Sequence, residues 1–389
     1  MSNSPFRPGY SRMPLVFGGH ERTVREFENV FQNFDIGENQ SVLVSGLRGA
    51  GKTSMLGTLG DLAAAHGWTV IREDAGTGLL SRVMDSRIPQ ILGTFDRDTR
   101  MRLTRLGIWE FTADFDYVER KREVTPLLRD DLAAIAQATD DRGILVLVDE
   151  VSSRKSALDE LSRFALELSH AIAEGLNIVV VFAGVKIELD ELLAQPHLTF
   201  LRRSRQLIFR RLSAEATRRV IRETTEAGGR KLALDAEEHL ITTSQGYPYL
   251  VQLVGDYAWR NNPDADGITL EDAESAREKA ISEVEERVIS RVYRDLSEKD
   301  REFLQAMSPD DGVSKMGSIA DRMGVSPQYA NIYKQRLIDS GYVQMAGRGF
   351  VDFSLPYLRE YVRTVVSTTS ASPREPDNGG WDEFPPPKR

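Results

Sequence analysis

Five short apolar segments, separated by stretches with a helical spacing of apolar residues, set the pattern of the first half of the chain. Each segment is a run of Val, Ile, Leu or Phe bounded by polar residues or Gly, which is typical of a buried strand. The five segments lie at 41–46, 68–74, 143–150, 177–184 and 206–212. Most of the intervening stretches repeat apolar residues every three or four positions. This alternation predicts an α/β fold with a mostly parallel sheet.

The interval 76–142 is less regular than the rest of this half. Apolar spacing predicts one helix at 79–92 and another at about 125–138. Between them, residues 101–118 show a short alternation of apolar and polar positions, which predicts an added strand or hairpin.

Beyond residue 212 the pattern becomes helical. Two helical stretches follow Ser213 and Asp235, which are both residue types that cap helices, and each stretch closes on Gly. Together they predict a small helical lid over residues 213–262. The charged stretch that follows has the acid and base spacing of a solvated helix, so residues 263–295 are expected to connect the lid to a third unit.

The pattern changes again at residue 296. Three helical patterns come first, with a short turn at 324–326, and two strand-like segments then flank a Gly-containing tip at 347–349. This is the order of a winged helix-turn-helix over 296–366, with Pro327 in the first turn of the recognition helix. The ends differ in composition: residues 1–13 are expected to be flexible, and residues 367–389, rich in Ser, Pro, Gly and charge, to be disordered.

Composition narrows the class of protein further. No apolar stretch approaches the roughly 18 residues of a membrane span, the N-terminus has no signal-peptide core, and the chain has no Cys. These features predict a cytoplasmic protein without a membrane partner. The net charge of −9 argues against a nucleic-acid-binding protein that is basic over its whole surface, but it is compatible with a local basic face.

The sequence GLRGAGKTS follows the first predicted strand and precedes a helical pattern. Its spacing, G-x-x-x-x-G-K-T, is that of a P-loop, in which backbone N–H groups cradle phosphates, Lys52 reaches the outer phosphates and Thr53 offers its hydroxyl to Mg²⁺. ATP and Mg²⁺ are therefore the expected cofactors. The expected nucleotide-binding residues are Gly46, Gly49, Ala50, Gly51, Lys52, Thr53 and Ser54.

A pair of acids ends the predicted strand at 143–150. Asp149 is expected to hold the magnesium shell, and Glu150 to orient and partly deprotonate the attacking water. Lys52 and Glu150 are therefore both expected to be catalytic residues. These motifs predict that residues 14–212 form a P-loop ATPase core.

The motifs resemble those of the AAA+ ATPases, and most of all their origin-recognition, or Orc1/Cdc6-like, branch. Residues 16–27, VFGGHERTVREF, look like the opening box of that branch, which implies that Phe17 and Gly18 lie near adenine; His20 stands where Arg is common. The resemblance covers most of residues 15–260, and the predicted winged domain also fits it. Signalling STAND ATPases are similar as well, because GYPYL at 246–250 looks like their lid motif, which implies a nucleotide contact for Pro248.

The chain departs from the AAA+ pattern at both sensor positions. The fourth strand ends in Ala183 and Gly184 rather than in a polar residue, so the first sensor is either absent or displaced to Lys186. Tyr249 stands where the resemblance implies a sensor Arg in the lid. The resemblance also places arginine fingers near Arg202 and Arg203, which would be donated to a neighbouring copy in a homo-oligomer and speed an otherwise slow hydrolysis.

The third unit offers side chains that could meet double-stranded DNA. They lie on the predicted recognition helix and at the wing tip, and are Gln328, Tyr329, Asn331, Lys334, Gln335, Arg336 and Arg348. The acids of this unit at least balance its bases, so a winged domain used for protein contacts is an equal alternative.

Three functions fit the sequence. The first is an ATP-hydrolysing AAA+ switch that couples nucleotide state to a winged helix on DNA. The second is a STAND-like signalling or defence ATPase whose winged domain mediates autoinhibition or protein contacts. The third is an ATP-binding scaffold that barely hydrolyses ATP.

Overall fold

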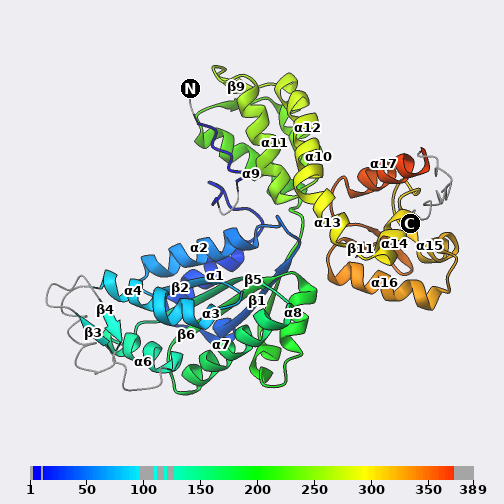
Figure 1. Ribbon diagram of the computed structural model, residues 1–389. Helices are drawn as coiled ribbons and strands as arrows, with labels where there is room; N and C mark the ends of the chain where they lie inside the picture. The colour runs from blue at the N-terminus through cyan, green and yellow to red at the C-terminus, as the bar shows by residue number, and fades with distance from the viewer. Residues whose placement is uncertain (1–2, 10–11, 96–108, 112–117, 121–126, 372–389) are drawn as a thin grey trace, which may run out of the picture.

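The computed structural model describes the whole chain except residues 1–2, 10–11, 96–108, 112–117, 121–126 and 372–389. It shows a core built around a sheet, a helical lid above it and a C-terminal unit beside both (Figure 1). None of the described helices is long and apolar enough to cross a membrane.

The central sheet has the strand order β2-β5-β6-β1-β7, and all its neighbouring strands are parallel. Each strand begins within one residue and ends within three residues of a segment predicted from the apolar pattern, so the predicted α/β fold is confirmed. The strands are β1 (Ser41–Gly46), β2 (Thr69–Asp74), β5 (Ile144–Val151), β6 (Ile178–Gly184) and β7 (Arg205–Phe209).

Helices cover both faces of this sheet, and two separate apolar clusters fill the space between them. Residues 79–94, predicted mostly as one helix, form three consecutive helical pieces. The core helices are α1 (Glu21–Asn33), η1 (Gly37–Gln40), α2 (Lys52–Ala65), α3 (Leu79–Arg82), η2 (Val83–Arg87), α4 (Ile88–Thr94), α6 (Leu128–Ala138), α7 (Lys155–Ala173), α8 (Lys186–Leu193) and η3 (Thr199–Arg203).

The stretch predicted as a hairpin contains a short antiparallel pair. Its strands are β3 (Trp109–Phe111) and β4 (Val118–Arg120), and the residues between and around them lie outside the described part of the chain.

The lid consists of α9 (Ala214–Ala227), α10 (Leu234–Ser244) and α11 (Pro248–Asn261), with a small parallel pair formed by β8 (Lys231–Leu232) and β9 (Gly267–Ile268). Ser213 caps α9 as predicted, because its Oγ accepts from the backbone N–H of Ala216 at 3.1 Å. Asp235 does not cap α10. It lies inside the first turn, where its negative charge interacts favourably with the positive N-terminal end of the helix dipole.

A connector leads from the lid to the C-terminal unit. It consists of α12 (Leu270–Val284), η4 (Glu285–Ile289) and α13 (Ser290–Asp295). Thr269 and Asp272 form a capping box at the start of α12. One continuous apolar cluster runs from the lid through the connector into the C-terminal unit, so these three parts share a core that is separate from the clusters around the sheet.

The C-terminal unit has the predicted order of three helices followed by two strands, and Ser326 and Pro327 begin its third helix. A short strand before the second helix was not predicted; it completes a three-stranded antiparallel sheet in the order β10-β12-β11. The elements are α14 (Glu298–Met307), β10 (Ser314–Lys315), α15 (Met316–Met323), α16 (Pro327–Asp339), β11 (Val343–Met345), β12 (Phe350–Phe353) and α17 (Leu358–Ala371).

Both ends of the chain differ from the sequence expectation. The disordered tail was expected from residue 367, but α17 continues to Ala371. At the N-terminus, where residues 1–13 were expected to be flexible, Phe6 is only 2% exposed and is packed against the lid. Burying a large apolar side chain contributes about 1.5–3 kcal/mol of stabilising free energy. This is enough to order a short segment that the sequence pattern alone predicts to be a loop.

Candidate nucleotide site

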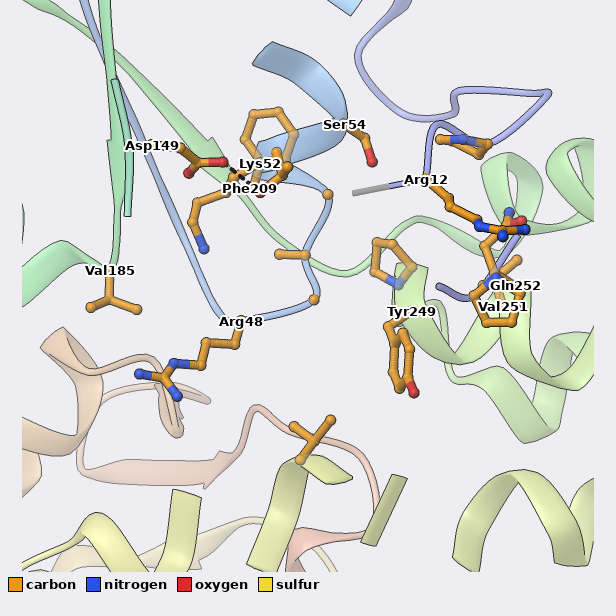
Figure 2. A pocket seen from close by; sticks show the side chains of 18 of the residues that line it. Arg12, Arg48, Lys52, Ser54, Asp149, Val185, Phe209, Tyr249, Val251 and Gln252 are labelled. Atoms are coloured by element: carbon orange, nitrogen blue, oxygen red, sulfur yellow. Dashed lines mark hydrogen bonds between the residues drawn. The ribbon is translucent and has the colours of Figure 1, made fainter. Parts of the chain in front are cut away.

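A cavity of about 700 Å³ opens where the core, the lid, the N-terminal segment and the connector meet (Figure 2). Its walls include the loop between β1 and α2, the end of β5, the start of α8 and the first turn of α11. This volume is in the range of small-molecule sites, and it lies beyond the carboxyl ends of parallel strands, where such folds bind ligands.

Residues 48–54 of the P-loop form one wall of the cavity, whereas Gly46, which was also expected to bind nucleotide, does not line it. Gly49 and Gly51 have φ values of 73° and 95°, a left-handed backbone that Gly adopts readily and that turns the loop around an open centre. The Nζ of Lys52 donates to the carbonyl oxygens of Gly46 and Leu47 at 2.9 and 2.8 Å. Burial lowers the pKa of Lys52, and the nearby carboxylate of Asp149 opposes that shift.

Thr53 and Asp149 meet at the end of the loop. The hydroxyl of Thr53 donates to Asp149 Oδ2 at 2.6 Å, and Asp149 is buried. Hydroxyl and carboxylate oxygens are the ligand types of Mg²⁺, which binds through one or two protein oxygens, water and substrate phosphate. The donor set therefore fits the metal that the sequence predicts.

Glu150 lines the same cavity and has an unusual backbone. Its φ is 53°, rare for a residue other than Gly, and the pairing of β5 with β6 is irregular between Val148 and Val151. Its own N–H donates to Asp149 Oδ1 at 2.9 Å. Such backbone conformations concentrate at functional sites, and here the irregularity exposes the Glu150 side chain at the end of a buried strand.

The opening box, for which the resemblance implied a place near adenine, lies against the lid. Phe17 and Gly18 line the cavity, and so does Pro248 at the start of α11. Gly18 approaches α9 so closely that a Cβ there would lie 2.4 Å from Val220 Cγ2. His20, which stands where Arg is common, stacks on Phe209 with ring centroids 3.8 Å apart, and burial lowers the pKa of its imidazole.

The two sensor positions carry no cation. Ala183 is buried in β6, and Lys186 does not line the cavity but pairs with Asp190 and Asp339 at 2.5 and 3.1 Å. Tyr249 does line the cavity, and its N–H donates to the carbonyl of Gly49 at 3.2 Å. The lid is thus hydrogen-bonded to the P-loop without a charged side chain.

Several lining residues were missed by sequence reasoning. Glu188, in the first turn of α8, is half-buried, and its burial raises the pKa of its carboxyl. No sequence motif near Glu188 could have identified it as a residue of the site. The other missed polar residues come from the N-terminal segment, the P-loop, the strand end, the lid and the connector: Arg7, Arg12, Arg48, Ser152, Arg154, Gln252, Arg287 and Arg291.

Arg202 and Arg203 lie outside the cavity of their own chain. Both are exposed at η3, and Arg202 Nε donates to the carbonyl of Leu193 at 3.3 Å. The structure therefore does not bring these two expected catalytic residues to the cavity of their own chain.

Three of the DNA-contact candidates, Tyr329, Gln335 and Arg336, form hydrogen bonds within the C-terminal unit. Arg336 pairs with Asp300 and donates to Ser297 Oγ at 2.8 Å, and Gln335 donates to Asp339 at 3.0 Å. Lys334 is half-buried. Apart from Lys334, all these candidates are exposed, and the hydroxyl of Tyr329 accepts from that of Tyr333 at 3.0 Å.

Comparisons with known proteins agree with this geometry at the level of the fold. A family model described as a domain of unknown function, DUF8462, matches residues 286–362. No curated protein matches the chain.

Solved structures match nearly the whole chain. A Walker-type ATPase of Pyrococcus abyssi superposes with a TM-score of 0.61 at 13% identity, covering 93% of this chain and 98% of that one. The ORC2 protein of Aeropyrum pernix, in ADPNP-ADP complexes, gives a TM-score of 0.57 at 15% identity, covering 94% and 98%. The chain therefore has the fold of the Orc1/Cdc6-type AAA+ ATPases, as its motifs predicted.

Proposed function

We propose that the protein is an ATP-binding, slowly ATP-hydrolysing AAA+ switch in which the nucleotide held at the P-loop sets the position of the C-terminal unit. Lys52 and the loop amides would hold the phosphates, Thr53 and Asp149 the Mg²⁺ ion, and Glu150 the attacking water. The metal would neutralise charge on the phosphates.

One contact carries the proposal. The carbonyl of Leu47 accepts a hydrogen bond from Lys52, and the side chain of Leu47 touches the C-terminal unit, where a Cβ on Gly341 would lie 2.7 Å from Leu47 Cδ2. A phosphate that draws Lys52 away from this carbonyl acts on a residue that the C-terminal unit touches. Close packing transmits such small shifts because packed contacts have discrete arrangements.

Other contacts hold the C-terminal unit between core and lid. Arg211, just after β7, donates to the carbonyls of Ser354 and Phe353 at 2.7 and 3.3 Å. On the lid side, the hydroxyl of Tyr357 donates to the carbonyl of Thr243 at 2.8 Å. A lid movement is therefore expected to carry the C-terminal unit with it and to break its contacts to the core.

We expect Arg211→Ala to release the C-terminal unit from the core, because it removes both of these charge-assisted bonds. A net loss of about 1.5 kcal/mol would shift the docked fraction roughly tenfold. Because the chain has no Cys, nitroxide labels can be placed at Glu174→Cys in the core and Gln344→Cys on β11. The distance distribution between them should gain a second component.

Arg210→Ala is the matched control, since this neighbouring Arg is exposed. Identical distance distributions in the Arg211→Ala variant and the parent would show that these contacts do not hold the unit.

The C-terminal unit is proposed to be a winged helix. The end of α16 near Asp339 and Gly341 faces the core, whereas the exposed candidates Gln328, Tyr329 and Asn331 lie near its start. That exposed half supports double-stranded DNA as the partner, read by a recognition helix whose other end is held by the ATPase.

The contacts to the core equally suit a STAND-like autoinhibitory module. A mobility-shift titration with random duplex DNA at two salt concentrations separates the two, because phosphate contacts make DNA affinity fall with salt.

A further inference from the structure

The lid holds the backbone of Arg48 in the P-loop. Tyr247 is buried, and its hydroxyl donates to the carbonyl of Arg48, while the N–H of Tyr249 donates to the carbonyl of Gly49 at 3.2 Å. A Cβ on Gly49 would lie 2.4 Å from the Tyr247 hydroxyl, so the loop and the lid meet without a gap. Burial raises the pKa of Tyr247, which keeps its phenol protonated and able to donate. The side chain of Arg48 therefore starts from a fixed point.

The guanidinium of Arg48, in contrast, is not held. Arg48 is exposed and lines the cavity, and no other described side chain forms a hydrogen bond or an ion pair with its guanidinium. Figure 2 shows it extending from the loop on the same side as Lys52, opposite to Arg12 and Gln252. No bond within the described part of the protein has to break when this side chain turns toward a ligand.

Four charged side chains lie near the ammonium group of Lys52. After burial, which lowers its pKa, the groups that act on Lys52 most are Asp149, Glu150, Arg48 and Glu188. Burial raises the pKa of Glu188, and Arg48 is the strongest of the charges that oppose this shift. All five side chains line the cavity. Three carboxylates and two cations thus share the end of the cavity at the P-loop.

Hydrolysis of ATP at this end would need a further positive charge. Water attacks the γ-phosphorus, the bond to the bridging oxygen breaks with its electron pair passing to ADP, and Glu150 takes a proton from the water. Negative charge on the outer oxygens of the transferred group is best stabilised by donors that are already in place. Ala183 and Tyr249 leave both sensor positions without a cation. Arg48 is a guanidinium beside the lysine that would bind the same phosphate.

We propose that Arg48 turns toward the γ-phosphate of bound ATP and stabilises the transition state of hydrolysis from within its own chain. Its planar fork of N–H donors matches the oxygens of a phosphoryl group. ADP has no γ-phosphate, so Arg48 contributes to ATP turnover and not to the affinity for ADP. This inference rests on the proposed function, because it assigns the γ-phosphate to the end of the cavity at Lys52.

Arg48→Ala is expected to lower ATP turnover about 30-fold, less than the loss of a fully buried donor would cause, because this guanidinium is exposed. The affinity for ADP should stay within about threefold of the parent value. Arg48→Lys keeps the charge but not the planar fork, so it should recover part of the loss. Arg25→Ala, at an exposed arginine of α1 outside the cavity, is the control and should match the parent. Steady-state phosphate release and calorimetric titration with ADP measure the two quantities.

Protein concentration separates a cation of the same chain from one of a neighbouring copy. Turnover per molecule should be the same in dilute and in concentrated parent protein. A rate that rises with concentration, and that is lost in Arg202→Ala or Arg203→Ala but not in Arg48→Ala, would overturn the inference.

The measurements on Arg48→Ala can also overturn it directly. Turnover within about threefold of the parent would exclude the role, and an equal loss of affinity for ADP and ATP would show that the side chain only supports the loop. A parent that binds ATP without hydrolysing it would exclude the role of Arg48 but leave the nucleotide site in place. A parent that binds neither nucleotide would overturn the proposed function itself, and the inference with it.

Discussion

Replacing Lys52 by alanine is expected to weaken nucleotide binding by at least about 100-fold, because in the proposed function this side chain would donate two or more charge-assisted hydrogen bonds to phosphate oxygens. In the structure its Nζ bonds to the carbonyls of Gly46 and Leu47, within the loop that would hold those oxygens. Titration calorimetry with ADP and with a non-hydrolysable ATP analogue measures the loss.

The free Lys52→Ala protein should remain folded, since burial disfavours the charged form of this lysine. Lys231→Ala, at an exposed position in the lid, is the control and should bind as the parent does. An ATP affinity of Lys52→Ala within threefold of the parent value would contradict the proposal that this loop binds the phosphates of the nucleotide.

Glu150→Gln is expected to reduce ATP turnover by about 10²–10⁴-fold while nucleotide affinity stays near the parent value. The amide keeps the shape of the side chain at the end of β5 but cannot accept a proton from water. Steady-state phosphate release, with binding measured in parallel, gives both quantities.

Glu188 provides the decisive comparison for that experiment. It is the other glutamate that lines the cavity among the described residues, and burial raises the pKa of its carboxyl. If Glu188→Gln rather than Glu150→Gln stopped turnover, the base would lie on α8. Glu174→Gln, at the exposed end of α7, controls for a change of charge alone.

The parts of the molecule that the sequence predicted correctly are those with a local signal. The five strands of the sheet are apolar runs that can be recognised without knowing their tertiary contacts. The P-loop is likewise one contiguous motif between a strand and a helix. Ser213 caps its helix through a bond to the residue three positions on, which is a local feature that the sequence displays directly.

What the sequence did not predict depends on contacts between distant residues. Arg7 and Gln252 are separated by 245 positions, and neither lies in a recognisable motif. Lys186 was a candidate for a displaced sensor, yet its position on α8 turns it toward Asp339 in the C-terminal unit, while Glu188 of the same helix lines the cavity. A one-dimensional pattern cannot show which face of a helix meets a ligand when the neighbouring unit is unknown.

The most direct test of the switch is the distance between nitroxides at Glu174→Cys and Gln344→Cys, measured with ADP and with a non-hydrolysable ATP analogue. The account predicts two different distance distributions in the parent and a single, nucleotide-independent one in Lys52→Ala. Identical distributions with both nucleotides, in a parent protein shown to bind each of them, would contradict the claim that the nucleotide sets the position of the C-terminal unit.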